Sequence, residues 1–221
     1  MRLNRTRQAI EIDNHILLLR NLVSKIDEVD NIESLRGYEG RGTAIYFEGF
    51  SKGFLTEDFA FQRRVRRPPT DPVNALLSLG YTLLLNQVIA SVNLVGFDPF
   101  FGTLHSMDYG RPSLALDLME EWRPTIVDTL VLSVLNLKAL IPSDFEERPM
   151  PQESITDERE EVLGDDNKGE HEKGCESAIL PERKKVSIVL TETGFRKFIT
   201  QYERKMGEKV QYHLTKCNLS H

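Results

Sequence analysis

The chain has few of the features that mark several common classes of protein. It holds only two cysteines among 221 residues, so a disulfide scaffold is excluded, and no zinc-ligand spacing is present. No secretory signal is recognisable at the N-terminus. The longest apolar run, residues 75–95, is long enough to span a membrane. Three polar side chains interrupt this run: Asn86, Gln87 and Asn93. We therefore expect a soluble, cytoplasmic protein without a membrane segment.

Negative charge is concentrated in one part of the chain. The whole sequence carries a formal charge of −6. Residues 144–183 hold 14 Asp and Glu but only 5 Lys and Arg, a balance of −9, so the remainder carries +3. Few aromatic residues and many charges predict a disordered acidic linker or insert over 143–182. The remaining, mildly basic part is compatible with contact to DNA.

Outside that segment the apolar spacing is typical of helices, and the fold class is predicted to be mainly α. Caps, glycines and prolines at the ends predict helices over 8–29, 31–38, 43–52, 72–96, 113–124, 125–140 and 191–206. We expect one helical lobe over residues 1–142 with a long buried central helix. Residues 183–221 are predicted to add a C-terminal helix and tail to the same lobe.

The region from Gly102 to Pro124 contains the first candidate site. It places His105 in a loop flanked by glycine and proline, before a helix that carries Asp117 and Glu120. Residues three apart share one face of a helix, so the two carboxylates and the imidazole can converge on a divalent cation. The alternative is a solvated histidine and a wet helix face. Apolar neighbours on nearly all sides of the helix favour burial, and buried carboxylates need partners.

Glu39 is a second acidic candidate, because Gly37, Gly40 and Gly42 surround it. Glycines disfavour a regular helix and allow another backbone or a ligand to approach closely. The alternative interpretation is a corner between two helices, with an exposed glutamate.

Two groups of arginines complete the candidates. A cluster before a proline pair could neutralise DNA phosphates or form a solubilising loop: Arg63, Arg64, Arg66 and Arg67. Arg111 and Arg123 flank the acidic helix and could pair with its carboxylates instead.

Several blocks, in order, resemble the CRISPR-associated integrase family, the nuclease that inserts new spacers into CRISPR arrays. They begin with Leu-Arg-Gly-Tyr-Glu-Gly-Arg-Gly-Thr-Ala-Ile-Tyr-Phe at 35–47 and end with a weaker match at 190–198. The blocks between them are residues 64–84, 96–105 and 111–124. The resemblance covers residues 1–142 well and 186–206 loosely. Ordered blocks are more specific than any single short pattern.

This resemblance implies a metal-dependent endonuclease and integrase of CRISPR antiviral defence. Glu39, His105 and Glu120 match the family's metal ligands, and Asp117 matches a further acidic position near the metal. Asp117 could hold His105 or act as a transient ligand, and the sequence does not choose between them. The hard donor set suits Mg²⁺ or Mn²⁺. The family's partners would be double-stranded and branched DNA, a small CRISPR adaptation protein and a second copy of the chain.

The chain also departs from the family pattern. The family places a β-rich domain before the helical lobe and a further helical segment after it, and neither is recognisable here. An alternative expectation is therefore a truncated, non-catalytic DNA-binding or assembly fragment. A transposon-encoded relative that uses the same chemistry is the third possibility.

Overall fold

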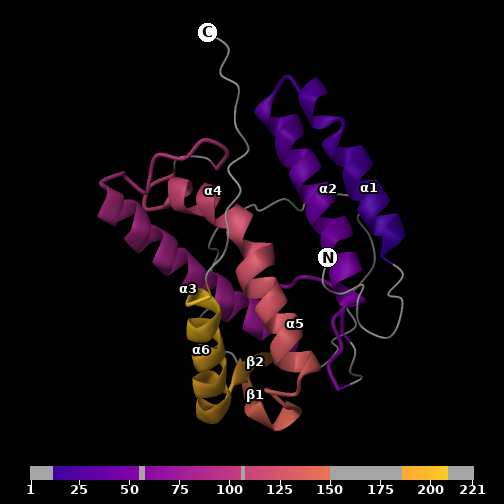
Figure 1. Cartoon of the computed structure of the whole chain (residues 1–221), viewed down its shortest axis with the longest axis vertical. Coiled ribbons are helices and arrows are strands. Elements are labelled where there is room, and N and C mark those ends of the chain that lie inside the picture. The colour runs from indigo at the N-terminus through magenta and orange to yellow at the C-terminus, as the bar shows by residue number, and fades with distance from the viewer. Residues whose placement is uncertain (1–11, 55–57, 106–107, 150–185, 209–221) are drawn as a thin grey trace, which may run out of the picture.

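The computed structural model describes residues 12–54, 58–105, 108–149 and 186–208 and is mainly α-helical, as predicted (Figure 1). The α-helices are α1 (Asp13–Val23), α2 (Ile32–Ser51), α3 (Pro72–Val95), α4 (Ser113–Trp122), α5 (Thr129–Asn136) and α6 (Glu192–Met206). Short 3₁₀ turns lie at η2 (Ile26–Glu28) and η4 (Pro142–Asp144), and η3 (Arg123–Asp128) is a π-helix. The strands β1 (Phe145–Pro149) and β2 (Val186–Leu190) form a small antiparallel pair.

Helices α1 and α2 pack side by side as a hairpin at one side of the molecule (Figure 1). The prediction of separate helices over 31–38 and 43–52 is wrong, because α2 runs unbroken through all three glycines around Glu39. Each interior glycine costs a helix about 1 kcal/mol relative to alanine. Here glycine also allows close packing: a Cβ on Gly42 would lie 3.4 Å from the Leu22 side chain of α1. Packing against α1 therefore outweighs the local preference of glycine.

Helix α3 is the central helix, and its predicted ends are confirmed. The Asp71 carboxylate accepts a hydrogen bond from the Asn74 amide (2.8 Å), and Gly96 ends the helix with a φ of 88°. The N-terminal half is buried against η3, α5 and α6, whereas Leu94 and Val95 at the other end are exposed. The prediction of a buried central helix is thus confirmed for the first half only.

Helix α3 is also the one described helix that is long and apolar enough to cross a membrane, by length and composition alone. A core helix of a soluble protein meets the same criterion. Its contacts are those of a core helix, since Gly80 packs so closely that a Cβ there would lie 2.5 Å from Val127 of η3.

The chain does not break at Pro124, contrary to the prediction. Helix α4 passes into the π-helix η3, which contains Pro124, and then into α5. Proline cannot supply the usual amide hydrogen bond, and the wider π turn accommodates this loss. The helix predicted over 125–140 begins within η3, and its α-helical part ends at Asn136.

Strands β1 and β2 were not predicted, and β1 lies inside the segment assigned to the acidic linker. Phe145 pairs with Leu190, and Pro149 pairs with Val186. Asp144, just before β1, is buried and forms an ion pair with Lys197 of α6 (2.9 Å). The predicted boundary at residue 143 is therefore wrong. The acidic composition of this segment did not indicate β1, because its partner strand β2 is distant in sequence. Residues 150–182 of the predicted linker lie outside the described residues.

Helix α6 begins and ends almost where the sequence predicts. Thr191 caps it by accepting a hydrogen bond from the Gly194 amide (3.1 Å). Phe198 and Tyr202 pack into the core, whereas Phe195 is exposed.

Candidate functional site

The loop that carries His105 is fixed to the start of α4. The Leu114 amide donates a hydrogen bond to the carbonyl oxygen of Pro99 (2.9 Å). Gly102 lies against α4 so closely that a Cβ there would be 2.5 Å from the Cβ of Ser113. Only glycine fits this approach without displacing the loop. The glycine before His105 is thus required by packing.

The carboxylate of Asp117 holds this loop from the α4 side. Its Oδ2 accepts hydrogen bonds from the Thr103 amide (2.5 Å), the Thr103 hydroxyl (3.1 Å) and the Leu104 amide (3.0 Å). Its Oδ1 accepts from the His105 amide (3.1 Å) and lies 2.6 Å from His105 Nδ1. Burial alone would raise the pKa of Asp117, but these hydrogen bonds lower it to about 2. Asp117 is therefore a firmly ionised group whose hydrogen bonds all serve the His105 loop, as expected of a residue that orients His105.

His105 is buried, with 7% of its surface exposed. In the neutral ring, Nδ1 donates its proton to Asp117, which leaves the lone pair on Nε2. Nε2 is buried and has no hydrogen-bond partner among the described residues. A histidine whose Nδ1–H is held by a carboxylate presents Nε2 in the form that binds a metal ion. This geometry fits the predicted role of His105 as a metal ligand.

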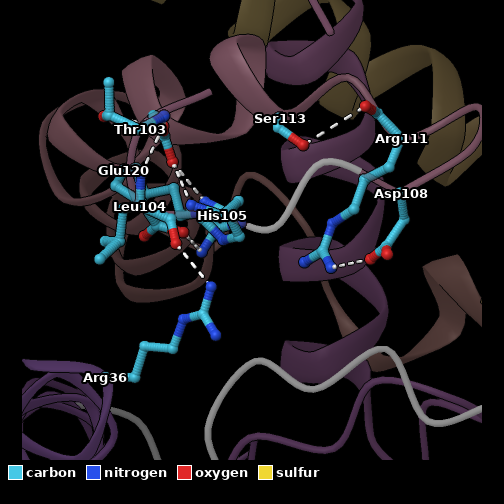
Figure 2. A network of polar contacts seen from close by, with 10 residues as sticks. Arg36, Thr103, Leu104, His105, Asp108, Arg111, Ser113 and Glu120 are labelled. Atoms are coloured by element: carbon cyan, nitrogen blue, oxygen red, sulfur yellow. Dashed lines mark hydrogen bonds and ion pairs between the residues drawn. The ribbon is translucent and has the colours of Figure 1, made fainter. Parts of the chain in front are cut away.

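Glu120 lies one helical turn beyond Asp117, close to His105 in the view of Figure 2, and forms an ion pair with Arg123. The guanidinium of Arg123 also lies over the ring of Tyr81, 5.0 Å from its centroid. Burial raises the pKa of Glu120, and the nearby charge of Glu39 raises it further, while Arg123 and His105 oppose both. Glu120 therefore shares one electrostatic environment with the other two predicted ligands.

The predicted pairing of arginines with the carboxylates of α4 holds for one of the two. Arg123 pairs with Glu120, whereas Arg111 lies 3.4 Å from Asp108, which precedes the helix.

Glu39 lies within α2 and is half-buried, so it is not at an exposed corner between two helices. One turn earlier, Arg36 donates a hydrogen bond to the carbonyl oxygen of Leu104 (2.9 Å), next to His105 (Figure 2). Helix α2 therefore contacts the His105 loop one turn from Glu39, and the charge of Glu39 acts on Glu120. In the part of the chain that is described, however, no three His, Cys, Asp or Glu side chains lie together closely enough to hold a metal ion. The three-ligand set stays a prediction.

Beside this region lies a buried carboxylate that the sequence analysis missed. Asp128, in η3, is 2% exposed and accepts hydrogen bonds from the hydroxyls of Tyr46 (2.7 Å) and Tyr81 (2.6 Å). Burial raises the pKa of Asp128, although the two tyrosines oppose the change. These bonds join α2, α3 and η3, and the Tyr81 ring also lies against Arg123, the partner of Glu120. An isolated acidic residue in the apolar run 125–135 was the available signal.

The arginine cluster divides into an internal and an external part. Arg64 donates hydrogen bonds to Asn74 Oδ1 (2.9 Å) and Ser78 Oγ (3.0 Å), and burial lowers its pKa to about 10. Arg64 is thus engaged within the chain. Arg63, Arg66 and Arg67 are exposed, and their contact with DNA phosphates stays a prediction.

Comparison with known proteins identifies the family. The family model for "CRISPR associated protein Cas1" matches residues 1–163, so the chain belongs to the Cas1 family. A CRISPR-associated endonuclease Cas1 of Thermus thermophilus is 46% identical over 129 residues, 58% of this chain and 39% of that protein. One of Leptospira interrogans is 46% identical over 143 residues, 64% of this chain and 56% of that protein. The chain thus spans about two fifths to just over half of these relatives.

Solved structures of a casposase and of a Cas1-containing complex share the fold. A casposase bound to its integration product matches with a TM-score of 0.69 and 25% identity, over 95% of this chain and 48% of the casposase. A partial Cas6-RT-Cas1–Cas2 complex matches with a TM-score of 0.70 and 26% identity, over 91% of this chain and 51% of the matched one.

Proposed function

We propose that this chain carries the metal-binding part of a DNA endonuclease and integrase that inserts spacer DNA into CRISPR arrays by phosphodiester transesterification. The observation that carries the proposal is the arrangement of His105, whose ring is fixed by Asp117 and whose buried Nε2 has no hydrogen-bond partner among the described residues. Relatives named as endonucleases, and a similar casposase bound to an integration product, support the reaction class.

Glu39, His105 and Glu120 would hold Mg²⁺ or Mn²⁺, since two carboxylates and one imidazole form a mostly hard donor set. A divalent ion there would polarise a phosphodiester and lower the pKa of the attacking hydroxyl. The chain's own contribution is to keep the donors in place. Asp117 fixes the tautomer and orientation of His105, and Arg123 offsets the negative charge of Glu120.

The substrate would be double-stranded and branched DNA. Arg66 is exposed, and the charges of Arg123, Glu120 and Glu39 act on its guanidinium. It therefore lies at the edge of the site. We expect Arg63, Arg66 and Arg67 to contact DNA phosphates there. Similarity to chains of Cas1–Cas2 complexes supports a small adaptation protein of the Cas2 type as partner, together with a second copy of the chain. Such an enzyme is expected in the cytoplasm.

The test combines metal binding with DNA chemistry. Isothermal titration with Mn²⁺ should show one site per chain, and His105→Ala should abolish it without changing the number of carboxylates. His15→Gln is the matched control, because it removes another buried imidazole, from α1. Branched DNA should be cleaved or joined in the presence of Mn²⁺ by the wild-type chain and by the control. Mn²⁺ binding that is unchanged in His105→Ala would reject the site.

A second candidate function is a non-catalytic DNA-binding or assembly fragment. In the described part of the chain no three His, Cys, Asp or Glu side chains lie close enough to hold a metal ion, and this observation is compatible with the second candidate. Positioning of two DNA ends contributes much of the rate of such a reaction. Mn²⁺ binding that depends on His105 without any DNA cleavage would support this second candidate. The transposon-encoded alternative predicts the same chemistry, and gene neighbourhood distinguishes it.

A further inference from the structure

The three predicted ligands belong to two different parts of the fold, the helix α2 and the unit formed by the His105 loop and α4. His105 and Glu120 belong to one unit, because Asp117 binds the His105 loop to α4. Glu39 belongs to α2, which forms a hairpin with α1. The alignment of Glu39 with the other two therefore depends on what fixes α2 against the His105 loop.

Besides the packing of its C-terminal half in the core, two side-chain hydrogen bonds join α2 to other elements, and Glu39 lies between them. On the C-terminal side the Tyr46 hydroxyl donates to Asp128 (2.7 Å), seven residues or about 10 Å along the helix from Glu39. On the N-terminal side Arg36 donates to the Leu104 carbonyl oxygen (2.9 Å). Arg36 precedes Glu39 by three residues, so the two side chains leave the same face of α2.

The Arg36 contact joins the elements almost at the ligands themselves. Leu104 precedes His105 directly, and its amide is already held by Asp117 (3.0 Å). The carbonyl that Arg36 binds is therefore part of a fixed loop, and Figure 2 shows the Arg36 side chain extended from below toward it. Without this bond, the nearest described hydrogen bond that joins α2 to η3 would be that of Tyr46, two helical turns from Glu39.

We propose that Arg36 is a positioning residue that holds the part of α2 around Glu39 against the His105 loop and so supports the metal site. This inference rests on the proposed function. Arg36 would act through the loop carbonyl, and its positive charge would be incidental to this role.

The direction in which the Mn²⁺ affinity changes on replacement of Arg36 distinguishes this positioning role from a purely electrostatic one. Loss of a positive charge near a cation site favours cation binding through Coulomb's law. Loss of a group that positions a ligand weakens binding, and supporting residues around metal ligands are typically worth 10- to 100-fold in affinity. We therefore expect Arg36→Met to bind Mn²⁺ about tenfold more weakly than the wild-type chain in isothermal titration without DNA. Arg36→Lys, which keeps a donor, should recover part of the loss.

The matched control is Arg41→Met, which removes the same charge from an exposed position of the same helix. Its Mn²⁺ affinity should equal or slightly exceed that of the wild-type chain. Spin labels at Glu33 on α2 and Asn93 on α3, with both native cysteines replaced by serine, give a second readout that needs no metal. Arg36→Met should broaden the distance distribution between them, and Arg41→Met should not.

Mn²⁺ binding in Arg36→Met that is as tight as in the wild-type chain, or an unchanged distance distribution, would overturn the inference. Arg36 is exposed, so the fold should tolerate its replacement. If circular dichroism shows that Arg36→Met is unfolded, Arg36→Gln is measured in its place under the same criteria. Failure of the proposed function is distinct, because it appears as Mn²⁺ binding that survives His105→Ala.

Discussion

Among the described residues two histidines are buried beside carboxylates, one in the α1–α2 hairpin and one in the loop held by α4. Each is 7% exposed, and each leaves one buried ring nitrogen without a hydrogen-bond partner among the described residues. His15 Nε2 lies 3.4 Å from Glu48, whose side chain is 70% exposed. His105 Nδ1 lies 2.6 Å from Asp117, whose side chain is 11% exposed.

The difference lies in how the carboxylate is held. Glu48 is free to turn into water, so its pairing with His15 is weak and leaves the ring orientation loosely defined. Asp117 is fixed by three backbone amides of the His105 loop, so its geometry defines that of the imidazole. Burial of a histidine is therefore a poor mark of function, whereas a histidine bound to an immobilised carboxylate is a better one.

The largest expected effect is the loss of the Asp117 carboxylate. Asp117→Ala leaves three amides and a histidine without their acceptor, and each buried unsatisfied donor costs about 1–3 kcal/mol. We expect the free energy of unfolding to fall by about 3 kcal/mol in urea titrations, because such losses do not add fully. Glu48→Ala should change it by less than about 0.5 kcal/mol. Similar losses in the two variants would remove the distinction between the two histidines.

The contribution of the Asp117 carboxylate to the free energy of unfolding should depend on pH. The folded-state pKa of Asp117 is about 2, below its ordinary value of 3.8, so the charged carboxylate stabilises the folded chain. This contribution is complete above about pH 4 and is lost as the pH falls toward 2. The stability difference between the wild-type chain and Asp117→Asn should therefore narrow over that range, as followed by urea unfolding at stepped pH. A difference that is constant between pH 5 and 2.5 would contradict the assignment.

Two glycines give a contrast of intermediate size. A Cβ at Gly102 would lie 2.5 Å from Ser113 and 3.0 Å from Asp117 Oδ2, so Gly102→Ala should displace the His105 loop. We expect a loss of about 1–3 kcal/mol, as for other overpacked sites. A Cβ at Gly37 meets nothing within 4 Å, so Gly37→Ala in α2 should stabilise the chain by about 0.5–1 kcal/mol. Thermal unfolding of both variants measures the contrast, and a stable Gly102→Ala variant would show that the loop is not held as described.

The smallest effect is a change of tautomer preference between the two rings. Long-range ¹H–¹⁵N spectra at a pH where the rings are neutral should show His105 with its proton on Nδ1. His15 contacts Glu48 through Nε2, so its proton should lie mainly on Nε2, with a weaker preference between the two tautomers than in His105. A neutral His105 with its proton on Nε2 would contradict the ligand geometry that we assign to it.

Helix positions could be read from the sequence wherever local rules decide them. The Asp71 cap, Pro72 and Gly96 set the ends of α3, and Thr191 sets the start of α6, because capping depends on residues that are close in the chain. The two mistaken breaks lie at the glycines of α2 and at Pro124. At both, a geometry that local preference does not indicate is adopted: α2 packs closely against α1 at its glycines, and the π turn at Pro124 accommodates the missing amide hydrogen bond.

The candidate site shows the same division. His105, Asp117 and Glu120 were identifiable because a loop and the following helix hold all three within 16 residues. The glycines around Glu39 made it a candidate. Its electrostatic influence on Glu120 could not be derived from the sequence, because the two residues are 81 positions apart in the chain. The internal use of Arg64 and the burial of Asp128 between Tyr46 and Tyr81 were not visible either.

The sequence by itself determined the mainly helical fold, the ends of its central and final helices, the family and the residue types of a candidate metal site. These follow from periodicity, caps and ordered motifs, which are local properties of the chain. Only the tertiary structure decided that Asp117 holds His105, that Arg123 pairs with Glu120 and that Arg36 ties α2 to the His105 loop. The physical reason is that partner choice for a buried charge depends on which donors the packed helices bring within hydrogen-bonding distance, and some of these donors are distant in sequence.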